Sequence, residues 1–318
     1  MKKIGIIGGA GFIGSYITKI FLEEDFTVKT SVTDLSNKQK YLHLKNLPNG
    51  SNLEITEMNV LETGSIKKFA TGCNILVHGG SPFRLEVKNP QKELFLPIVN
   101  GTENFLNVVK NIPTVEKVVI LSCVNAYNTS FPLPADDKSP DYLYTEEDVP
   151  YMHENNHTYS QARFYADQTV REFTEANPEL SFEIVSLFPT FVIGKPLSDR
   201  DDSISVRIQN MLRDNPASDI LPDMLQEKDA ELAMVGVNDV AKAVFKAAAK
   251  SGLHGKNYFL SSESWKVSDL SRMLNNRNPA GKPFIAYSNK LASRILGVNF
   301  KPVNKSLNNS EMVQPDIN

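Results

Sequence analysis

Short apolar segments and amphipathic segments alternate along the first 190 or so residues of the chain. Six short segments read as β-strands: Ile4–Ile7, Thr27–Val32, Leu53–Met58, Asn74–His78, Lys117–Ser122 and Phe182–Phe188. Between them, apolar residues recur at helical spacing in Phe12–Glu24, Thr63–Thr71, Lys92–Asn111 and His157–Ala176. The centre of Lys117–Ser122 is apolar on both faces, as in a parallel sheet that helices cover on both sides. The alternation predicts an α/β fold with a doubly wound, mostly parallel sheet.

After about residue 190 the alternation becomes irregular. Ser198–Asp202 reads as a charged loop, and Asn238 is expected to cap a helix over Asp239–Lys250 that Gly252 closes. Three further elements are a helix, a strand and a helix at Ile204–Arg213, Lys256–Leu260 and Val267–Leu274. The polar, Asn-rich residues 304–318 predict a loosely ordered tail. The C-terminal third is therefore expected to form a smaller lobe on the carboxyl edge of the sheet.

Composition narrows the class of protein. The 318 residues include 34 Lys+Arg and 37 Asp+Glu, so the net charge is −3, and no basic stripe indicates nucleic acid binding. The longest apolar stretch, Ile184–Ile193, is interrupted by Pro189 and is too short to span a bilayer. The N-terminus reads as a strand rather than a signal peptide, and two cysteines, Cys73 and Cys123, cannot build a disulfide framework. We therefore expect a cytoplasmic protein without nucleic acid or membrane partners.

A glycine-rich turn joins the first predicted strand to the first predicted helix. It reads Ile7-Gly-Gly-Ala-Gly-Phe-Ile-Gly-Ser15. Glycines let such a turn close and let the backbone approach a pyrophosphate, while the helix N-terminus offers free N–H groups to the phosphates. Gly8, Gly11 and Gly14 are therefore predicted to bind a dinucleotide. We expect a dinucleotide-binding Rossmann domain over residues 1–188, a substrate lobe over 189–303 and the tail over 304–318.

This glycine segment resembles the extended short-chain dehydrogenase/reductase superfamily, in its NAD-dependent epimerase/dehydratase group. Further segments extend the resemblance over about residues 1–300: Ser31–Lys40, His43–Pro48, Val77–Pro82, Asn100–Thr102, Val118–Cys123, Pro189–Gly194 and Ser288–Lys290. Together they are most similar to the branch of dihydroflavonol reductase and cinnamoyl-CoA reductase. The resemblance implies a Rossmann fold with a smaller substrate lobe, a nicotinamide cofactor and a small carbonyl substrate. It leaves both a monomer and a homodimer open.

The resemblance also implies which residues hold the cofactor. Phe12 and Ile13 would contact it through their backbone, and Pro189 and Val192 would border the nicotinamide. Asn59 takes the place of the family's adenine-binding Asp, and its carbonyl oxygen can still accept from the adenine amino group. The remaining contacts follow the third and fourth predicted strands and pass along the adenine and ribose: Val60, Gly79, Gly80 and Ser81.

The choice between NADP and NAD depends on the end of the second predicted strand. Family members that use NADP place an Arg there to pair with the 2′-phosphate, whereas this chain has Thr33. Lys40 stands where a second phosphate-binding Lys is often found, although it fits a solvated helix face equally well. Asp34 lies 20 residues after Gly14, the usual distance for a ribose-binding acid, but two positions beyond the strand end. We expect NADP in preference to NAD.

Two of the three catalytic positions depart from the family pattern. Reductases of this superfamily use a Ser that holds the substrate oxygen, and a Tyr that protonates it, four residues before a Lys that lowers the Tyr pKa. This chain has Tyr159 and Arg163 at that helical spacing, and Cys123 at the serine position; Ser122 fits only in a shifted register. Arg163 keeps the charge and can bind ribose but cannot deprotonate, and the Cys123 thiol is a weak donor.

These departures leave three functions open. The first is NAD(P)H-dependent reduction of a small carbonyl compound, with Tyr159 as proton donor, Arg163 as ribose binder and Cys123 as a weakened substrate contact. The second is a cofactor-binding sensor or regulatory protein with impaired catalysis. The third is a nucleotide-sugar epimerase or dehydratase, whose members normally keep the Tyr and Lys pair. We favour the reductase, because positioning of cofactor and substrate can preserve activity when catalytic groups change.

Two residues are expected to contact the substrate. Asn128 lies five residues after Cys123, where flavonoid reductases place a substrate-binding Asn. A turn residue is the alternative interpretation of this Asn. Ser81, which also borders the cofactor, is the second expected contact.

Two other motifs involve histidine. His153 and His157 match the zincin spacing His-Glu-x-x-His, which binds zinc only when a helix brings both rings to one face. Because this segment reads as a loop, we expect no metal. A thiol mechanism that pairs Cys123 with His78 is also set aside, because the family register aims the His elsewhere.

Overall fold

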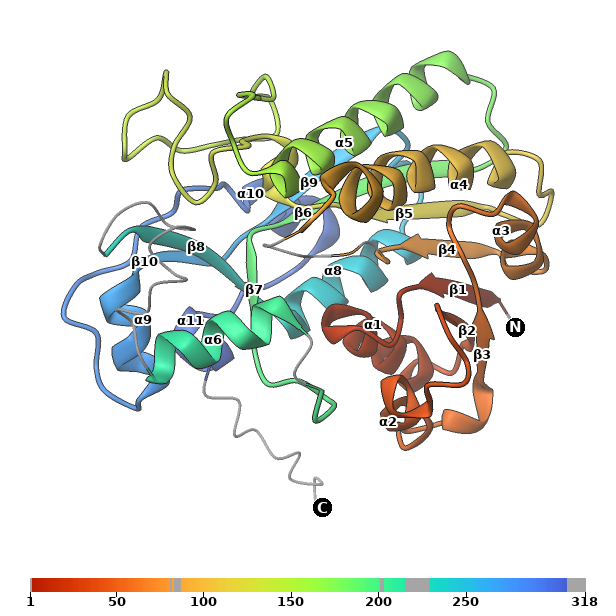
Figure 1. The fold of residues 1–318 in the computed structure, drawn as a ribbon, viewed down its shortest axis with the longest axis horizontal. Coiled ribbons are helices and arrows are strands. Elements are labelled where there is room, and N and C mark those ends of the chain that lie inside the picture. The colour runs from red at the N-terminus through yellow and green to blue at the C-terminus, as the bar shows by residue number, and fades with distance from the viewer. Residues whose placement is uncertain (1, 81, 83–86, 201–202, 215–228, 308–318) are drawn as a thin grey trace.

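A parallel β-sheet lies at the centre of the molecule, with helices on both of its faces (Figure 1). The structure is a computed structural model that describes residues 2–80, 82, 87–200, 203–214 and 229–307. Its main strands are β1 (Lys3–Ile7), β2 (Thr27–Val32), β3 (Leu53–Glu57), β4 (Ile75–His78), β5 (Lys117–Leu121), β6 (Glu183–Pro189) and β9 (Lys256–Leu260). Within the described residues they form one seven-stranded sheet in the order β3-β2-β1-β4-β5-β6-β9, every pair parallel. The predicted doubly wound fold is confirmed.

Helices cover the two faces of this sheet and build two separate cores. On one face lie α1 (Phe12–Glu23), α8 (Val237–Ala249) and α10 (Lys290–Leu296), and on the other α3 (Thr63–Ala70), α4 (Gly101–Val109) and α5 (Thr158–Ala176). Alternate residues of each strand enter opposite cores: on β5, Val119 and Leu121 enter the first and Val118 and Ile120 the second. This double burial explains why central strands such as β4 and β5 are largely apolar along their whole length.

A second, smaller sheet adjoins the carboxyl edge of the first. Its strands are β7 (Phe191–Ile193), β8 (Glu231–Gly236) and β10 (Glu263–Lys266), in the order β10-β8-β7. The helices α6 (Ile204–Asp214), α9 (Val267–Leu274) and α11 (Val303–Leu307) pack on it and share one apolar cluster around Trp265. None of these three strands follows from the sequence pattern, because they are short and gain their partners only from distant segments.

Three local expectations differ from the structure. The predicted helix Lys92–Asn111 is a π-helical segment, Gln91–Asn100, followed by α4; it contains Pro97, which lacks the N–H that a regular helix needs. The N-cap of α8 is Gly236, so Asn238 lies inside the helix. Residues 304–307 of the predicted tail belong to α11, which begins at the fully buried Val303. The rest of the tail, and residues 201–202 of the predicted charged loop, lie outside the described residues.

The division into two domains near residue 188 stays a prediction. Beyond that point the chain builds the smaller sheet, but it also returns to the large one through α8 and through β9, which pairs with β6. The helices in the described part of the chain are all too short or too polar to cross a membrane.

The turn between β1 and α1 leaves little room for side chains at two of its glycines. Gly8 has φ +79°, in the left-handed region. A Cβ on Gly14 would lie 2.1 Å from the carbonyl oxygen of Gly8, whereas a Cβ on Gly11 would meet only that oxygen, at 3.4 Å. Gly14 is therefore required for the fold of the turn, and Gly11 has space for a methyl group.

We predict that Gly14→Ala lowers the free energy of unfolding by about 1–3 kcal/mol, because the added methyl must displace backbone. Gly11→Ala is the matched control and should leave it within about 0.5 kcal/mol of the wild type. Urea unfolding followed by far-UV circular dichroism measures both. Equal stability of the two variants would contradict this account of the turn.

Candidate active site

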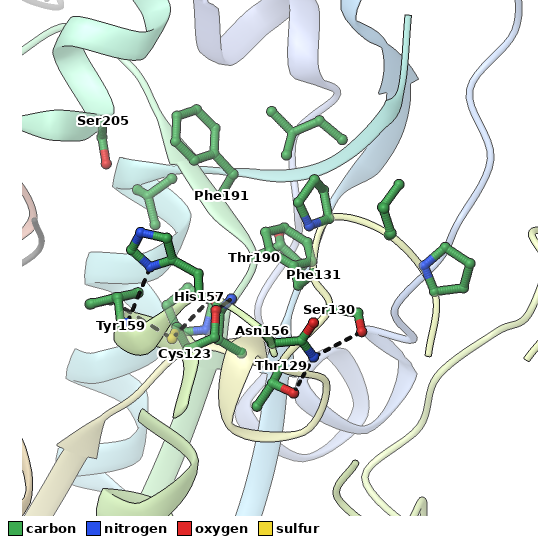
Figure 2. Close-up of a pocket in the computed structure, with 18 of the residues that line it drawn as sticks. Cys123, Thr129, Ser130, Phe131, Asn156, His157, Tyr159, Thr190, Phe191 and Ser205 are labelled. Atoms are coloured by element: carbon green, nitrogen blue, oxygen red, sulfur yellow. Dashed lines mark hydrogen bonds between the residues drawn. The ribbon is translucent and has the colours of Figure 1, made fainter. Parts of the chain in front are cut away.

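A cavity of about 390 Å³ opens at the carboxyl edge of the large sheet, where the two sheets meet. Its walls come from distant parts of the chain. Cys123 follows β5, and Tyr159 lies in the first turn of α5 (Figure 2). Ile13 lies in the first turn of α1, and Val192 on β7 and Leu232 on β8 line the side of the smaller sheet. In folds of this type, ligands bind at this edge of the sheet.

Tyr159 and Cys123 meet at the floor of this cavity, and Arg163 contacts Cys123 from the side of a smaller neighbouring cavity. One turn of α5 separates Tyr159 from Arg163, so both side chains reach the end of β5. The Arg163 Nε donates a hydrogen bond to the Cys123 Sγ at 3.4 Å, and its Nη2 donates to the Leu121 carbonyl oxygen at 3.2 Å. The Tyr159 hydroxyl lies 3.9 Å from the same Sγ (Figure 2). The three residues carried over by resemblance are therefore in contact.

The surroundings of Tyr159 keep its hydroxyl protonated. Burial raises the pKa of Tyr159 above its ordinary value, and the neighbouring Cys123 raises it further. The positive charge of Arg163 acts in the opposite direction and lowers it. A group with a raised pKa holds its proton at neutral pH, and the nearby guanidinium stabilises the phenolate that remains once the proton has left.

Ser122 and Cys123 face opposite sides of the β5 end. Cys123 lines the large cavity, whereas Ser122 is buried and borders a much smaller cavity on the other side, together with His78 and Asp167. The Ser122 N–H is also fixed by a hydrogen bond to the Leu187 carbonyl oxygen at 2.8 Å. The register in which Cys123 takes the serine position is therefore the one in the structure, and the shifted register is not.

The cavity has one apolar side and one polar side. The apolar side consists of Phe131, Pro132, Leu133, Pro134, Phe191 and Leu232. On the polar side, the Asn156 Nδ2 donates to the Thr129 Oγ1 at 2.7 Å and to the Ser130 Oγ at 3.1 Å (Figure 2). Among the described lining residues, Asp136 carries a charge of its own and no Lys or Arg is present.

The glycine turn lies directly beside this cavity. A Cβ on Gly8 would lie 2.5 Å from the Cα of Gly80, so the backbones after β1 and β4 are in contact. Ile13, Pro189 and Val192, all predicted to contact the cofactor, line the same cavity as Tyr159. Phe12 begins α1, and the N-cap of that helix, Gly11, forms no side-chain hydrogen bond with its N–H groups. Gly79 precedes Gly80, and Ser81 lies outside the described residues.

Comparison with known proteins identifies the family. The model of the NAD dependent epimerase/dehydratase family matches residues 4–260 of the chain. The chain belongs to this family. The resemblance inferred from the motifs is thereby confirmed, and the relatives below agree with the branch that the motifs indicated.

Similar proteins include several reductases. The chain is 26% identical to cinnamoyl-CoA reductase CAD2 of Medicago truncatula, over 95% of this chain and 92% of that protein. It is 24% identical to anthocyanidin reductase of Arabidopsis thaliana, over 87% and 81%. The structure of yeast methylglyoxal/isovaleraldehyde reductase Gre2 complexed with NADPH has a TM-score of 0.80 at 23% identity and covers 96% of both chains. Vestitone reductase from alfalfa gives 0.73 at 20% identity, also over 96% of both. At these identities the structural likeness concerns the fold.

Asn128 has a different place from the expected one. Its side chain is fully buried behind the cavity wall and is absent from the lining. Its Nδ2 donates to the Leu133 carbonyl oxygen at 2.8 Å and to the Tyr287 hydroxyl at 3.3 Å, and its Oδ1 accepts from the Ser130 N–H at 2.9 Å. Asn128 thus shapes the loop that forms the wall, as the turn interpretation expects, and does not line the cavity; its contact with a substrate stays a prediction.

The two histidines of the zincin-like segment serve local backbone contacts. The Nδ1 of His153 accepts from the Asn155 N–H at 3.2 Å. His157 is the N-cap of α5, and its Nδ1 accepts from the Tyr159 N–H at 3.2 Å (Figure 2). Across the described residues, no group of three or more His, Cys, Asp or Glu side chains could hold a metal ion.

The residues predicted to bind the adenosine end lie at the ends of β2 and β3. Thr33 is exposed, and Lys40 is half-buried at the end of the short helix η1 (Lys38–Lys40). The Asn59 Oδ1 accepts from the Leu61 N–H at 3.0 Å, so it is already engaged within its own turn. Val60 packs against Gly101 at the start of α4. Sequence motifs missed Arg200, which the structure brings to this same region.

His78 gives this part of the fold a pH-dependent stability. Burial lowers the pKa of His78 to about 4, and the charge of Arg163 adds to the effect. In the unfolded chain a histidine has a pKa of about 6.5. Between these two values the unfolded chain binds a proton that the folded chain does not, so stability falls as the pH falls through this interval.

We predict that this histidine contributes up to about 3 kcal/mol to the loss of stability between pH 7 and pH 4.5. His78→Leu should therefore show a smaller decrease than the wild type over the same interval, by urea unfolding at several pH values. Thr102→Val removes the hydroxyl that lies 3.4 Å from the ring but keeps the ring, and should retain the wild-type slope. Identical slopes for His78→Leu and wild type would rule out this contribution.

Proposed function

We propose that the protein is an NAD(P)H-dependent reductase of small, uncharged carbonyl compounds. The observation that carries the proposal is the contact of Tyr159 with Cys123 at the floor of a cavity that also borders the glycine turn, with Arg163 bonded to Cys123 beneath that floor. The relatives that match along most of the chain are named as reductases, which supports the same reaction class. The absence of Lys and Arg from the described lining residues favours an uncharged substrate over a carboxylate.

The residues around the glycine turn fit a dinucleotide. The uncapped first turn of α1 offers N–H groups to a pyrophosphate, and the backbone at Gly8 and Gly80 leaves no side chain in the way. Pro189 and Val192 would border the nicotinamide at the cavity, and Ile13 would contact the cofactor through its backbone. Arg163, which contacts Cys123, would bind the ribose. When bound, the reduced cofactor supplies the hydride that the reduction needs. We propose NADP(H) in preference to NAD(H).

Within this reaction Tyr159 delivers the proton. Its raised pKa keeps the phenol protonated until the carbonyl oxygen gains negative charge, and the proton then passes from the Tyr159 oxygen to that oxygen. Arg163 stabilises the resulting phenolate by its charge and stays protonated throughout. The Cys123 thiol, which donates to the Asn125 Oδ1 at 3.4 Å, is a poor donor to the substrate oxygen. The arrangement predicts a working reductase with modest turnover.

We predict that Tyr159→Phe lowers kcat for reduction by about 10²–10⁴-fold, because the proton donor is lost. The Kd for NADPH, measured by fluorescence titration, should change little, since the glycine turn is untouched. Neutral aldehydes and ketones are the substrates to test, with matched 2-oxo acids as the charged comparison. Wild-type activity on the acids alone would contradict the proposed substrate class, and full activity of Tyr159→Phe would contradict the proposed proton donor.

The double variant Cys123→Ser/Arg163→Lys restores the family's residues and should raise kcat by about 10-fold or more. A serine hydroxyl is a better donor than a thiol, and one hydrogen bond to a charged oxygen accounts for that factor. Consumption of NADPH by wild type and double variant is measured side by side on the same panel. If the double variant consumes NADPH and the wild type does not, the result would instead favour a cofactor-binding sensor.

A further inference from the structure

Arg200, on the loop between β7 and α6, reaches across the fold to the edge of the glycine turn. Its Nη1 donates to the carbonyl oxygen of Ala10 at 2.9 Å and to the carbonyl oxygen of Lys40 at 3.0 Å. Ala10 lies in the glycine turn, 190 residues away in sequence, and Lys40 ends η1. The guanidinium therefore bridges two segments that border the carboxyl end of β2.

Those two segments are packed together at the strand end. The Ser31 Oγ on β2 accepts a hydrogen bond from the Gly8 N–H at 3.1 Å. One small apolar cluster joins the turn, the strand and the segment after it: Ala10, Val32, Tyr41 and Leu44. In dinucleotide-binding folds, the group that reads the 2′ position of the adenosine ribose belongs at this strand end, an acid for NAD and an Arg for NADP.

The acid near this strand end is engaged elsewhere. The Oδ1 of Asp34 accepts from the Ser36 N–H at 2.8 Å and from the Ser36 hydroxyl at 2.6 Å. These hydrogen bonds, together with the charge of Lys40, hold the pKa of Asp34 below its ordinary value. NADP-using relatives are expected to have an Arg at position 33. Thr33 carries no charge, so this position offers no positive charge to a phosphate. The positive charge of Arg200 lies close enough to add to the effect of burial in lowering the pKa of His43.

We propose that Arg200 recognises the 2′-phosphate of NADP(H) and takes over the role expected of an Arg at position 33. This inference rests on the proposed function, because it requires dinucleotide binding at the glycine turn. The two carbonyl contacts fix the guanidinium beside the ribose site, and a guanidinium matches a phosphate in both geometry and charge. NAD lacks this phosphate, so Arg200 makes the protein select NADP(H).

The test is the binding of four ligands by isothermal titration: NADPH, NADH, 2′,5′-ADP and 5′-AMP. Arg200→Met should raise the Kd for NADPH and 2′,5′-ADP by about 10- to 100-fold and leave NADH and 5′-AMP within about two-fold. Arg200→Lys keeps the positive charge but not the planar guanidinium, and should give an intermediate loss of NADPH affinity. Adding Thr33→Arg to Arg200→Met should restore part of the NADPH affinity, because it places a cation at the position used by relatives.

Arg207→Met is the matched control, since Arg207 is exposed on the adjacent helix α6 and its loss removes the same charge. If Arg200→Met weakens the binding of NADPH and NADH equally, Arg200 only holds its loop in place, and the inference is overturned. An unchanged NADPH affinity, or an equal effect of Arg207→Met, would overturn it too. If the wild-type protein binds NADH more tightly than NADPH, the inference about Arg200 is wrong but the proposed function stands. If it binds neither nucleotide, the proposed function is wrong as well.

Discussion

The backbones that follow β1 and β4 touch each other without any side chain between them, and the rest of the carboxyl edge is arranged around that contact. A Cβ on Gly80 would lie 2.9 Å from the Gly8 nitrogen, so neither position tolerates a larger residue. This closeness sets the N-terminus of α1 at the middle of the sheet. It also leaves the next strand, β5, to carry Cys123 to the cavity floor, where α5 presents Tyr159.

Arg163 and Cys123, the two residues that depart from the family pattern, contact each other directly. The guanidinium is held at both ends, by the Sγ of Cys123 and by the Leu121 carbonyl oxygen, so its position depends on the main chain of β5 as much as on the thiol. A lysine has a single charged nitrogen and could not make this pair of contacts in the same fixed plane. The two departures from the family pattern are therefore mutually adapted.

Much of the large sheet, and the meeting of Tyr159, Cys123 and Arg163, could be predicted from the sequence. Lys117–Leu121, for example, is buried on both faces and is continuously apolar after its first residue, and the spacing of Tyr159 and Arg163 fixes them on one helix face. The smaller sheet could not be predicted in this way. Its strand β7 has three residues and is defined by its pairing with β8, some forty residues later in the sequence. The burial of Asn128 and the reach of Arg200 were also hidden, since both depend on contacts between distant segments.

Two strands pass from the large sheet to the small one side by side. β6 continues through Thr190 into β7, and β9 continues through Ser261 and Ser262 into β10, while the Thr190 N–H donates to the Leu260 carbonyl oxygen at 3.0 Å between them. A single connection could act as a hinge, but two hydrogen-bonded connections must bend together or not at all. This double connection therefore resists bending between the two sheets, and the cavity where they meet is lined on another side by residues of the segments 129–136 and 155–157.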